Sequence, residues 1–337
     1  MNYGDEMKNK GRILKIIIAA VAVVCALSAA VFLYSREKKY DFTEKSFISM
    51  DTVITEKIYG EGSSVHIAPV FSIVTGLDET INRFNEESEL YRLNTEGKTT
   101  DKSVIEIISS VKQISDDVGG AFDITVGDLS DLWSIGKEGE KVPTEKEIKA
   151  ALKDIGYGEI RVENGTVYHE GGEIDLGAVG KGFACDLIKA YLSSVGAEGA
   201  VVSVGGSILA YGDYNKKGDE WSIAIRHPRD ENAFLGIIHL DEGFVSTSGD
   251  YERYFEKDGK RYHHIFDART GMPADSGLVS VTVVAESGIL SDALSTACFI
   301  AGPEEGKRLI EKYGASAIFV DEEMNVTTVG EISFEKQ

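Results

Sequence analysis

The sequence contains few cysteines, few prolines and a shortage of basic residues. Three cysteines occur in 337 residues, at positions 25, 185 and 298, and none forms a Cys-x-x-Cys pair or has a histidine neighbour. Zinc and dithiol redox sites are therefore not expected. Cys185 and Cys298 lie in apolar helical patterns, which predicts buried, inert thiols, with a disulfide between them as the alternative. Five prolines leave few breaks, and no repeat or Pro-rich linker divides the chain.

The charge balance is strongly acidic. The 56 acidic side chains outnumber 35 basic ones, which gives a formal net charge of −21. Such a surface repels a phosphate backbone, so nucleic acid is not an expected partner. An anionic ligand would need local compensation from a metal ion, a few Lys or Arg side chains, or helix N-termini.

The N-terminus contains an uncharged apolar run over residues 16–34. Its length suits one transmembrane helix. We expect a short cytoplasmic N-terminus over 1–15, a single-pass membrane anchor over 16–34, and a linker over 35–45, with the domain that follows extracytoplasmic at the cell membrane. A cleaved signal peptide and a lipoprotein-like anchor at Cys25 are the alternatives.

The remaining sequence alternates strand-like and helix-like patterns, which predicts an α+β fold. Helices are expected where apolar residues recur at helical spacing, over Val65–Phe84, Val104–Ile114 and Glu145–Ile155. Strands are expected where branched and aromatic residues cluster, over Phe47–Tyr59, Val201–Tyr211, Trp221–Arg226, Leu235–Leu240, Val279–Ala285 and Ala317–Val320.

A glycine-rich segment, Asp175–Gly182, precedes a helical pattern. Such a turn presents backbone N–H groups to an anion, and Lys181 adds a full positive charge. The segment is not a Walker A loop, because Asp175 replaces the first glycine and Gly182 the Ser or Thr. The alternative is a tight packing turn with Lys181 on the surface.

A second segment, Ser291–Ala297, contains several oxygen-bearing side chains. On a helix, Asp292, Ser295 and Thr296 point to one side. One carboxylate with hydroxyls suits Mg²⁺, which keeps waters and takes up substrate phosphate. The alternative is a helix start with Ser291 as its N-cap.

A third segment contains two strand-like runs, Val245–Phe255 and His263–Gly271. A hairpin turning at Lys257–Lys260 would bring Thr247, Ser248 and His264 to one end. A histidine beside hydroxyls suits a general base, and a solvated strand-edge histidine is the alternative. In a fourth segment, Gly119–Trp133, two glycines precede Phe122 and Asp123, which would let backbone approach a flat ring, although Phe122 equally suits the core.

Eight segments in order resemble the ApbE family of FAD:protein FMN transferases. They are Met50–Thr52, Arg83–Asn94, Gly120–Thr125, Asp175–Gly182, Val204–Gly206, Thr247–Tyr251, His264–Gly271 and Ser291–Ala297. The resemblance implies a T-fold-like mixed α/β catalytic domain over 46–330, followed by a C-terminal tail over 331–337. It also implies Mg²⁺-dependent transfer of FMN from FAD to a Thr or Ser hydroxyl, through a phosphoester bond, with release of AMP.

The family's acceptors imply flavoprotein subunits of membrane redox complexes or extracytoplasmic flavin reductases as partners. Two other functions stay open: an FAD pyrophosphatase that gives FMN and AMP, and a non-catalytic extracytoplasmic FAD-binding protein.

The resemblance also implies the site residues. The flavin dinucleotide would contact Met50, Phe84, Ala121, Phe122, Asp123, Asp175, Lys181 and Ile265. The Mg²⁺ ligands would be the carbonyl of Ala178 and the side chains of Asp292, Ser295 and Thr296. Some relatives carry a second Asp where this chain has Ser295. We expect His264 to be the general base, with Asp292 and Lys181 as its catalytic partners.

Overall fold

The computed structural model describes residues 40–215 and 217–337. Residues 41–214 and 218–337 form one compact unit that contains all the described helices and strands. The predicted anchor over 16–34 lies outside the described residues. Within the described part, no helix is long and apolar enough to cross a membrane.

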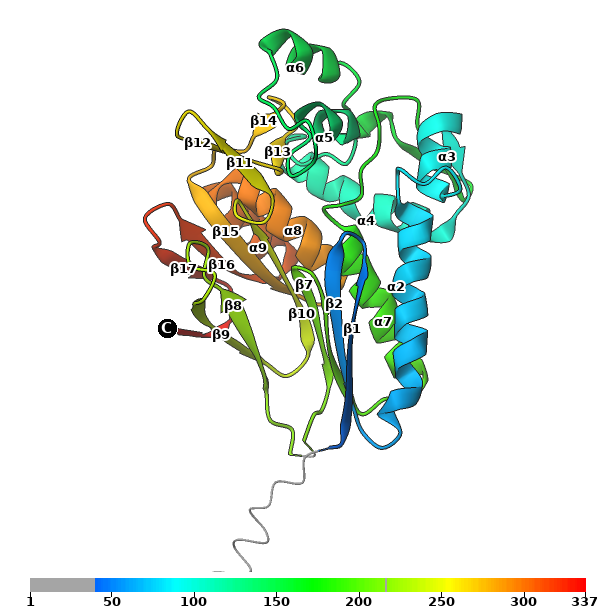
Figure 1. Cartoon of the computed structure of the whole chain (residues 1–337), viewed down its shortest axis with the longest axis vertical. Helices are drawn as coiled ribbons and strands as arrows, with labels where there is room; N and C mark the ends of the chain where they lie inside the picture. Colours follow the sequence, from blue (N-terminus) through cyan, green and yellow to red (C-terminus); the bar gives the residue numbers. More distant parts are fainter. Residues whose placement is uncertain (1–39, 216) are drawn as a thin grey trace, which may run out of the picture. The chain divides into compact units, whose positions relative to one another are not determined.

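The centre of the unit is an eight-stranded antiparallel sheet (Figure 1) with the order β1-β2-β6-β7-β10-β15-β16-β17. The strands are β1 (Phe42–Ser49), β2 (Thr52–Tyr59), β6 (Gly199–Val204), β7 (Ser207–Gly212), β10 (Gly243–Gly249), β15 (Leu278–Ala285), β16 (Ser316–Asp321) and β17 (Val326–Val329). β1 lies at one end of the strand order, so no described strand pairs with its outer edge.

Two strands expected from the sequence are hairpins. Phe47–Tyr59 was expected as one strand, but the chain reverses at Met50 and Asp51, whose φ angles are 51° and 55°. Neither residue is a glycine, and methionine rarely adopts a positive φ, so the sequence signals this left-handed turn only weakly, through Asp51. Val201–Tyr211 is likewise divided into β6 and β7, by a turn that begins at Gly205 with φ 60°.

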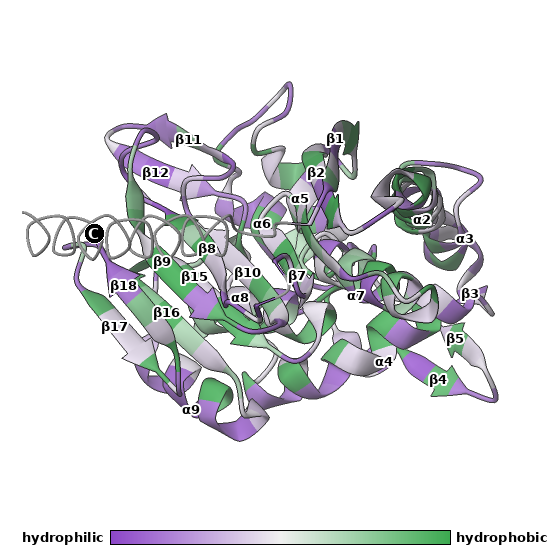
Figure 2. Cartoon of the chain, turned by 90° about the horizontal axis from the view of Figure 1, so that it is seen from below, coloured by the Kyte–Doolittle hydropathy of each residue, from purple (hydrophilic) through white to green (hydrophobic). Residues whose placement is uncertain are grey.

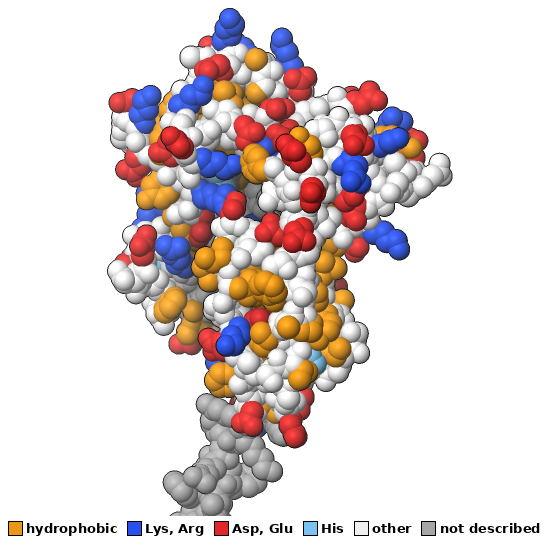
Figure 3. Space-filling view, turned by 45° about the vertical axis from the view of Figure 1, so that its right-hand side comes forward, with side chains coloured by type: hydrophobic (Ala, Val, Ile, Leu, Met, Phe, Trp, Pro, Cys, Tyr) orange, Lys and Arg blue, Asp and Glu red, His pale blue; other side chains and the backbone are white. Residues whose placement is uncertain are grey.

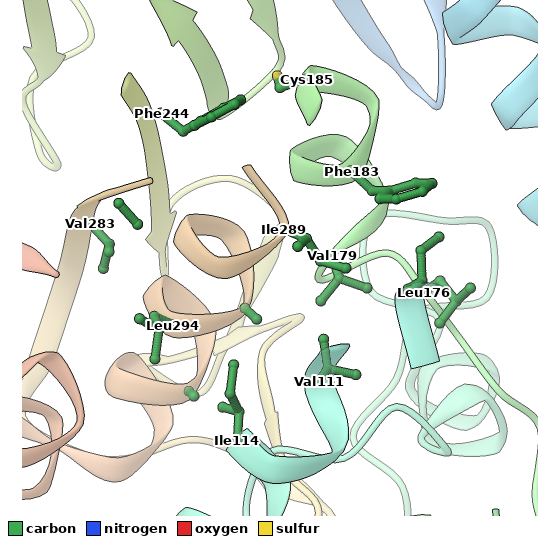
Figure 4. Packing of buried hydrophobic residues seen from close by; sticks show 14 of the residues in the cluster. Val111, Ile114, Leu176, Val179, Phe183, Cys185, Phe244, Val283, Ile289 and Leu294 are labelled. Atoms are coloured by element: carbon green, nitrogen blue, oxygen red, sulfur yellow. The ribbon is translucent and has the colours of Figure 1, made fainter. Parts of the chain in front are cut away.

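Helices cover one face of the sheet. They are α2 (Ile67–Ile81), α4 (Lys102–Asp117), α7 (Gly180–Ser194), α8 (Gly288–Ala301) and α9 (Pro303–Tyr313). α8 packs on β10 and β15, while α7 packs on β6 and β7. Figure 4 shows how Phe183 of α7, Leu294 of α8 and Ile114 of α4 point into one apolar core.

A three-stranded sheet packs on the opposite face. It has the order β18-β9-β8, from Ser333–Lys336, Phe234–Leu240 and Trp221–Arg226. Ile223 and Ile238 pack there against Val245 and Ile318 of the large sheet. β15 and β16 are buried along almost their whole length because both faces of the sheet are covered here, and Figure 2 shows green, hydrophobic positions along these two strands.

The smaller elements lie at one end of the fold, apart from η1 (Ser63–His66), which lies between β2 and α2 at the other end of the β1–β2 hairpin from its turn. They are α3 (Glu89–Glu96), α5 (Gly127–Trp133), α6 (Glu145–Ala151), the 3-10 helices η1 (Ser63–His66) and η2 (Tyr157–Glu159), and the short strands β3 (Lys98–Thr99), β4 (Arg161–Glu163), β5 (Thr166–Tyr168), β11 (Tyr254–Lys257), β12 (Lys260–His263), β13 (Phe266–Asp267) and β14 (Met272–Pro273). The predicted turn at Lys257–Lys260 is confirmed, and it joins β11 to β12. The run Val245–Phe255 is not one strand, because β10 pairs with β7 and β15 instead.

The predicted helices are confirmed with shifted ends. α2 is shorter than expected and follows η1, whereas α4 extends beyond both predicted ends. α6 begins with a capping box in which Thr144 and Glu147 satisfy each other's backbone N–H groups. The α+β fold class is therefore confirmed for the catalytic domain.

Candidate active site

A cavity of about 520 Å³ opens at one end of the large sheet. A volume of this order is typical of small-molecule sites. Its walls come from segments far apart in sequence: the β1–β2 turn, the end of α2, the loops before α5 and α7, the β6–β7 turn, the end of β10, the segment after β12, and α8. Figure 3 shows a hollow in the upper half of the drawn face, with blue side chains on one side and red ones on the other.

The glycine-rich segment and the Asp292 helix meet at the bottom of this cavity. A Cβ added to Gly182 would lie 2.1 Å from the carbonyl oxygen of Gly288, so the two backbones touch and no side chain fits between them. The Gly182 N–H donates to Asp292 Oδ2 at 2.8 Å, and Ser207 Oγ donates to Oδ1 at 3.1 Å. The helix turn that carries Lys181 thus holds the Asp292 carboxylate in place.

Asp292 is almost completely buried and still lines the cavity. Burial raises the pKa of its carboxyl group, and Lys181, the Gly182 N–H and the Ser207 hydroxyl oppose this shift. A buried carboxylate of this kind favours a cationic ligand at its open side. The proposed N-cap role of Ser291 is wrong, because α8 begins at Gly288 with Ser287 as its N-cap.

A group of hydroxyls lies between β10 and α8. Ser248 Oγ is 2.8 Å from Ser295 Oγ and 2.9 Å from Thr296 Oγ1. Ser295 Oγ also donates to the Asp292 carbonyl at 2.9 Å. Ser248 and Thr296 line the cavity, whereas Ser295 is fully buried beneath it. The sequence predicts Ser248 near the site but does not include it among the Mg²⁺ ligands. Ser248 is two residues from Ser246 on β10, so both side chains lie on the same face of the strand, and this alternation is the signal that places Ser248 beside α8.

Lys181 lies in the first turn of α7. Its ammonium group donates to the Gly177 carbonyl at 2.9 Å, and Gly177 and Ala178 both line the cavity. Asp175 accepts the Gly177 N–H at 2.8 Å, which shapes the turn before the helix. The expected glycine-rich turn before a helix N-terminus is therefore present, and Lys181 faces the cavity.

Arg83 was not predicted as a site residue, although it belongs to one of the matching segments. It is buried and forms ion pairs with Asp131, Glu173 and Asp175. Its guanidinium also lies 4.1 Å from the ring centroid of Phe84, an exposed residue at the cavity mouth. Arg83 therefore holds Asp175 and Phe84 in position, and both are predicted flavin contacts. A buried arginine cannot be recognised from sequence, because its partners are distant in the chain.

The Gly120–Thr125 segment forms another wall. Phe122 and Asp123 line the cavity, but Ala121 does not, and its carbonyl accepts the Ala268 N–H at 3.0 Å. Asp123 accepts N–H bonds from Thr125 at 2.8 Å and Tyr157 at 2.9 Å, so its carboxylate shapes this loop. Met50 and Ile265 complete the predicted flavin contacts that line the cavity.

His264 also lines the cavity. Its Nδ1 lies 3.2 Å from the Arg253 carbonyl oxygen. Because a carbonyl can only accept, Nδ1 carries the hydrogen and Nε2 keeps a lone pair. Burial, and next the positive charge of Arg253, lower the pKa of His264 to about 3. The imidazole is therefore neutral at physiological pH. The neighbouring His263 is buried and bonds the Ala274 carbonyl, which is a structural role.

The oxygen atoms at Asp292 fit Mg²⁺ better than a transition metal. The described residues contain no cluster of three or more His, Cys, Asp or Glu side chains that could hold a metal ion alone. One carboxylate, hydroxyls and a carbonyl are hard ligands that leave positions open for water and phosphate oxygens.

An oxygen-lined cavity with a lysine, a buried carboxylate and a neutral histidine contains the groups that a phosphoryl-group-transferring enzyme uses. The model of the ApbE family matches residues 50–319, and the chain belongs to this family. The chain is 36% identical over 241 residues to an FAD:protein FMN transferase of Vibrio cholerae, which covers 69% of this chain and 70% of that protein. A Klebsiella pneumoniae protein of the same description is 32% identical over 83% of this chain and 90% of its own length.

Solved structures of ApbE proteins have the same fold as this chain. The ApbE protein of Thermotoga maritima superposes with a TM-score of 0.78 at 29% identity, covering 86% of this chain and 97% of its own. The apo form of the Pseudomonas stutzeri flavinyl transferase ApbE gives a TM-score of 0.76 at 31% identity, covering 86% and 95%. The chain is therefore an enzyme, and its activity is flavin transfer from FAD to protein.

Proposed function

We propose that this enzyme moves the FMN half of FAD onto a Thr or Ser hydroxyl of an acceptor flavoprotein, with Mg²⁺ bound and AMP released. The supporting observation is the buried Asp292 carboxylate, which accepts an N–H bond from the residue next to Lys181. The carboxylate that would bind Mg²⁺ and the lysine that would bind phosphate oxygens therefore border the same cavity, which supports a pyrophosphate substrate.

Asp292, Thr296 and the carbonyl of Ala178 would hold Mg²⁺, with Ser295 as the fourth protein ligand. The bound ion would supply positive charge to the phosphate oxygens of FAD. Ser295 Oγ is engaged with Asp292 and Ser248. Ser295 therefore reaches the ion only if its hydroxyl rotates, while Thr296 is already at the cavity surface.

The remaining steps use the chain's own groups. Lys181 neutralises charge on the pyrophosphate, while the acceptor oxygen forms a bond to the FMN-side phosphorus and the bridging P–O bond breaks. The hydroxyl proton passes to His264 Nε2, and AMP leaves with the bridging oxygen. A base with a pKa of about 3 is weak. It suffices because a loose transition state releases the hydroxyl proton late.

FAD would be held by Met50, Phe84, Ala121, Phe122, Asp123, Asp175, Lys181 and Ile265. Ala121 does not line the cavity, and its carbonyl ties this loop to Ala268, so its contribution would be to position Phe122 and Asp123. The acceptors would be subunits of membrane redox complexes or extracytoplasmic flavin reductases. The apolar run at 16–34 would anchor the enzyme in the membrane with its catalytic domain outside the cytoplasm.

The test is incubation of the full chain with FAD, Mg²⁺ and a folded acceptor flavoprotein. We expect a fluorescent acceptor band, an FMN adduct on one Thr or Ser by mass spectrometry, and one AMP per adduct. Chelation of Mg²⁺ should abolish both products. AMP without an adduct would instead show an FAD pyrophosphatase, and FAD binding without AMP release would refute the proposed reaction.

A further inference from the structure

The face of the β1–β2 hairpin that points away from the helices is uncharged near its turn. It carries Ser46, Ile48, Val53, Thr55 and, from β6, Ser203, which are aligned by the strand register. We refer to these five residues as the uncharged shelf. Ile48 and Val53 are cross-strand partners and are 79% and 58% exposed. Large apolar side chains exposed side by side on a strand pair are typical of interaction surfaces.

The polar groups of the uncharged shelf are already hydrogen-bonded. Ser46 Oγ and Thr55 Oγ1 lie 3.1 Å apart, and Ser203 Oγ donates to the Gly205 carbonyl at 3.2 Å. Removing this surface from water therefore leaves few polar groups without partners. Core packing does not explain Ile48 and Val53, because the opposite face of the hairpin buries Ile54.

The uncharged shelf continues into the cavity wall. Met50, Asp51 and Thr52 connect Ser49 to Val53, and these three residues line the cavity together with Gly205 of the next turn. The turn is held firmly, since Asp78 of α2 accepts bonds from Ser49 Oγ and Met50 N at 2.7 Å each. A protein bound to the shelf would therefore lie at a fixed position beside the cavity mouth.

Other parts of the cavity rim are charged. Lys137, Glu252 and Arg253 line the cavity and are exposed. Burying such groups costs free energy unless each finds a partner. Figure 3 shows orange side chains gathered on the face below the hollow, whereas red and blue ones border the hollow itself. Among the described residues near the mouth, the uncharged shelf itself carries no charge, and the charge beside it that a docked protein would meet is Asp51 of the turn.

We propose that the uncharged shelf docks the folded acceptor protein, with Ile48 and Val53 as the central contacts. The proposal rests on the transfer of FMN to protein, which requires a second protein at this cavity on every turnover. A second copy of the chain fits less well, because each copy brings a formal charge of −21. The acceptor supplies an apolar patch next to its modified Thr or Ser.

The test compares the full-length wild type with the double variant Ile48→Ser, Val53→Ser. Val162→Ser is the matched control, since Val162 is an exposed strand residue of β4 that does not line the cavity. The probe is a folded flavoprotein subunit with one acceptor Thr, and its Thr→Ala variant is the blank. Rates of adduct formation give kcat and KM for this acceptor, and quenching of flavin fluorescence gives the Kd for FAD.

We expect the double variant to lose about tenfold in kcat/KM for the acceptor, equivalent to about 1.4 kcal/mol. The loss should be a raised KM, with kcat, the Kd for FAD and thermal stability unchanged. A loss below twofold, or an equal loss in the control, would overturn the proposal. A changed oligomeric state or vesicle association with unchanged acceptor KM would also overturn it, in favour of self-association or membrane contact. If the wild type itself forms no adduct, the transferase activity fails instead, which is a distinct result.

Discussion

Glu56 is a buried carboxylate whose two oxygens have no hydrogen-bond partner among the described residues. It lies on the face of β2 that also buries Ile54 and Ile58, opposite Val202 of β6. Desolvation raises the pKa of Glu56 to about 7, from an ordinary value of 4.5. The folded state therefore binds a proton that the unfolded state releases between these two values.

The direction of the pH dependence follows from the linkage between proton binding and folding. Because the folded-state pKa is the higher one, the stabilising contribution is complete below pH 4.5 and is lost as the pH rises through about 7. The shift from 4.5 to about 7 corresponds to about 3 kcal/mol in total. About 2.5 kcal/mol of this falls between about pH 5 and pH 8.

We predict that Glu56→Gln removes this pH dependence. Urea unfolding of wild type and variant at pH 5 and pH 8 should show that the wild type loses about 2.5 kcal/mol more than the variant. Glu56→Leu should be at least as stable as Glu56→Gln at both pH values, since an unpaired amide is also unfavourable in an apolar core.

Glu44→Gln is the matched control. Glu44 lies on the neighbouring strand β1, and its partly exposed carboxylate pairs with Lys57. This variant should keep the wild-type pH dependence. Parallel stability curves for wild type and Glu56→Gln would refute the reasoning, because they would mean that Glu56 is solvated or paired in solution.

Three further predictions concern the active site. Asp292→Asn should lower kcat for FMN transfer by about 10²-fold or more and weaken Mg²⁺ binding measured by calorimetry; unchanged Mg²⁺ affinity would contradict its role as a ligand. His264→Ala should lower kcat, and the wild-type rate should show no acidic limb between pH 5 and pH 7, because the pKa of His264 is about 3; a limb near 6.5 that disappears in the variant would contradict this. Gly182→Ala should destabilise the fold by about 3 kcal/mol or more in urea unfolding, because its Cβ would overlap the Gly288 carbonyl oxygen; a stability equal to wild type would show that the two helices move apart easily.

Much of the fold could be predicted from hydrophobic periodicity, as the long helices α2 and α4 illustrate. The hairpin at Met50–Asp51 could not, because methionine rarely adopts a positive φ and a single Asp without a following glycine is a weak turn signal. Its cause is tertiary: Asp78 accepts the Met50 N–H and fixes the turn from a different element.

The candidate site was predictable where one segment carries several functional groups. Asp292 and Thr296 are adjacent on one helix face, so their spacing alone predicts their common direction. Arg83 has partners at Asp131 and Glu173, far along the chain, so no local pattern indicates that it is buried. Ala121 belongs to a matching segment but does not line the cavity, so a matching segment alone does not show which of its residues face the site.

The contact between Gly182 and Gly288 has a consequence for protein engineering. Since the two backbones touch, the distance between the α7 turn and the α8 helix cannot shrink, and any added side chain would push the helices apart. A designer who wishes to adapt the cavity to a different pyrophosphate therefore has no freedom in the backbone here. What can be changed is the length of the side chains, for example by Lys181→Arg or Asp292→Glu, while the backbone keeps its position.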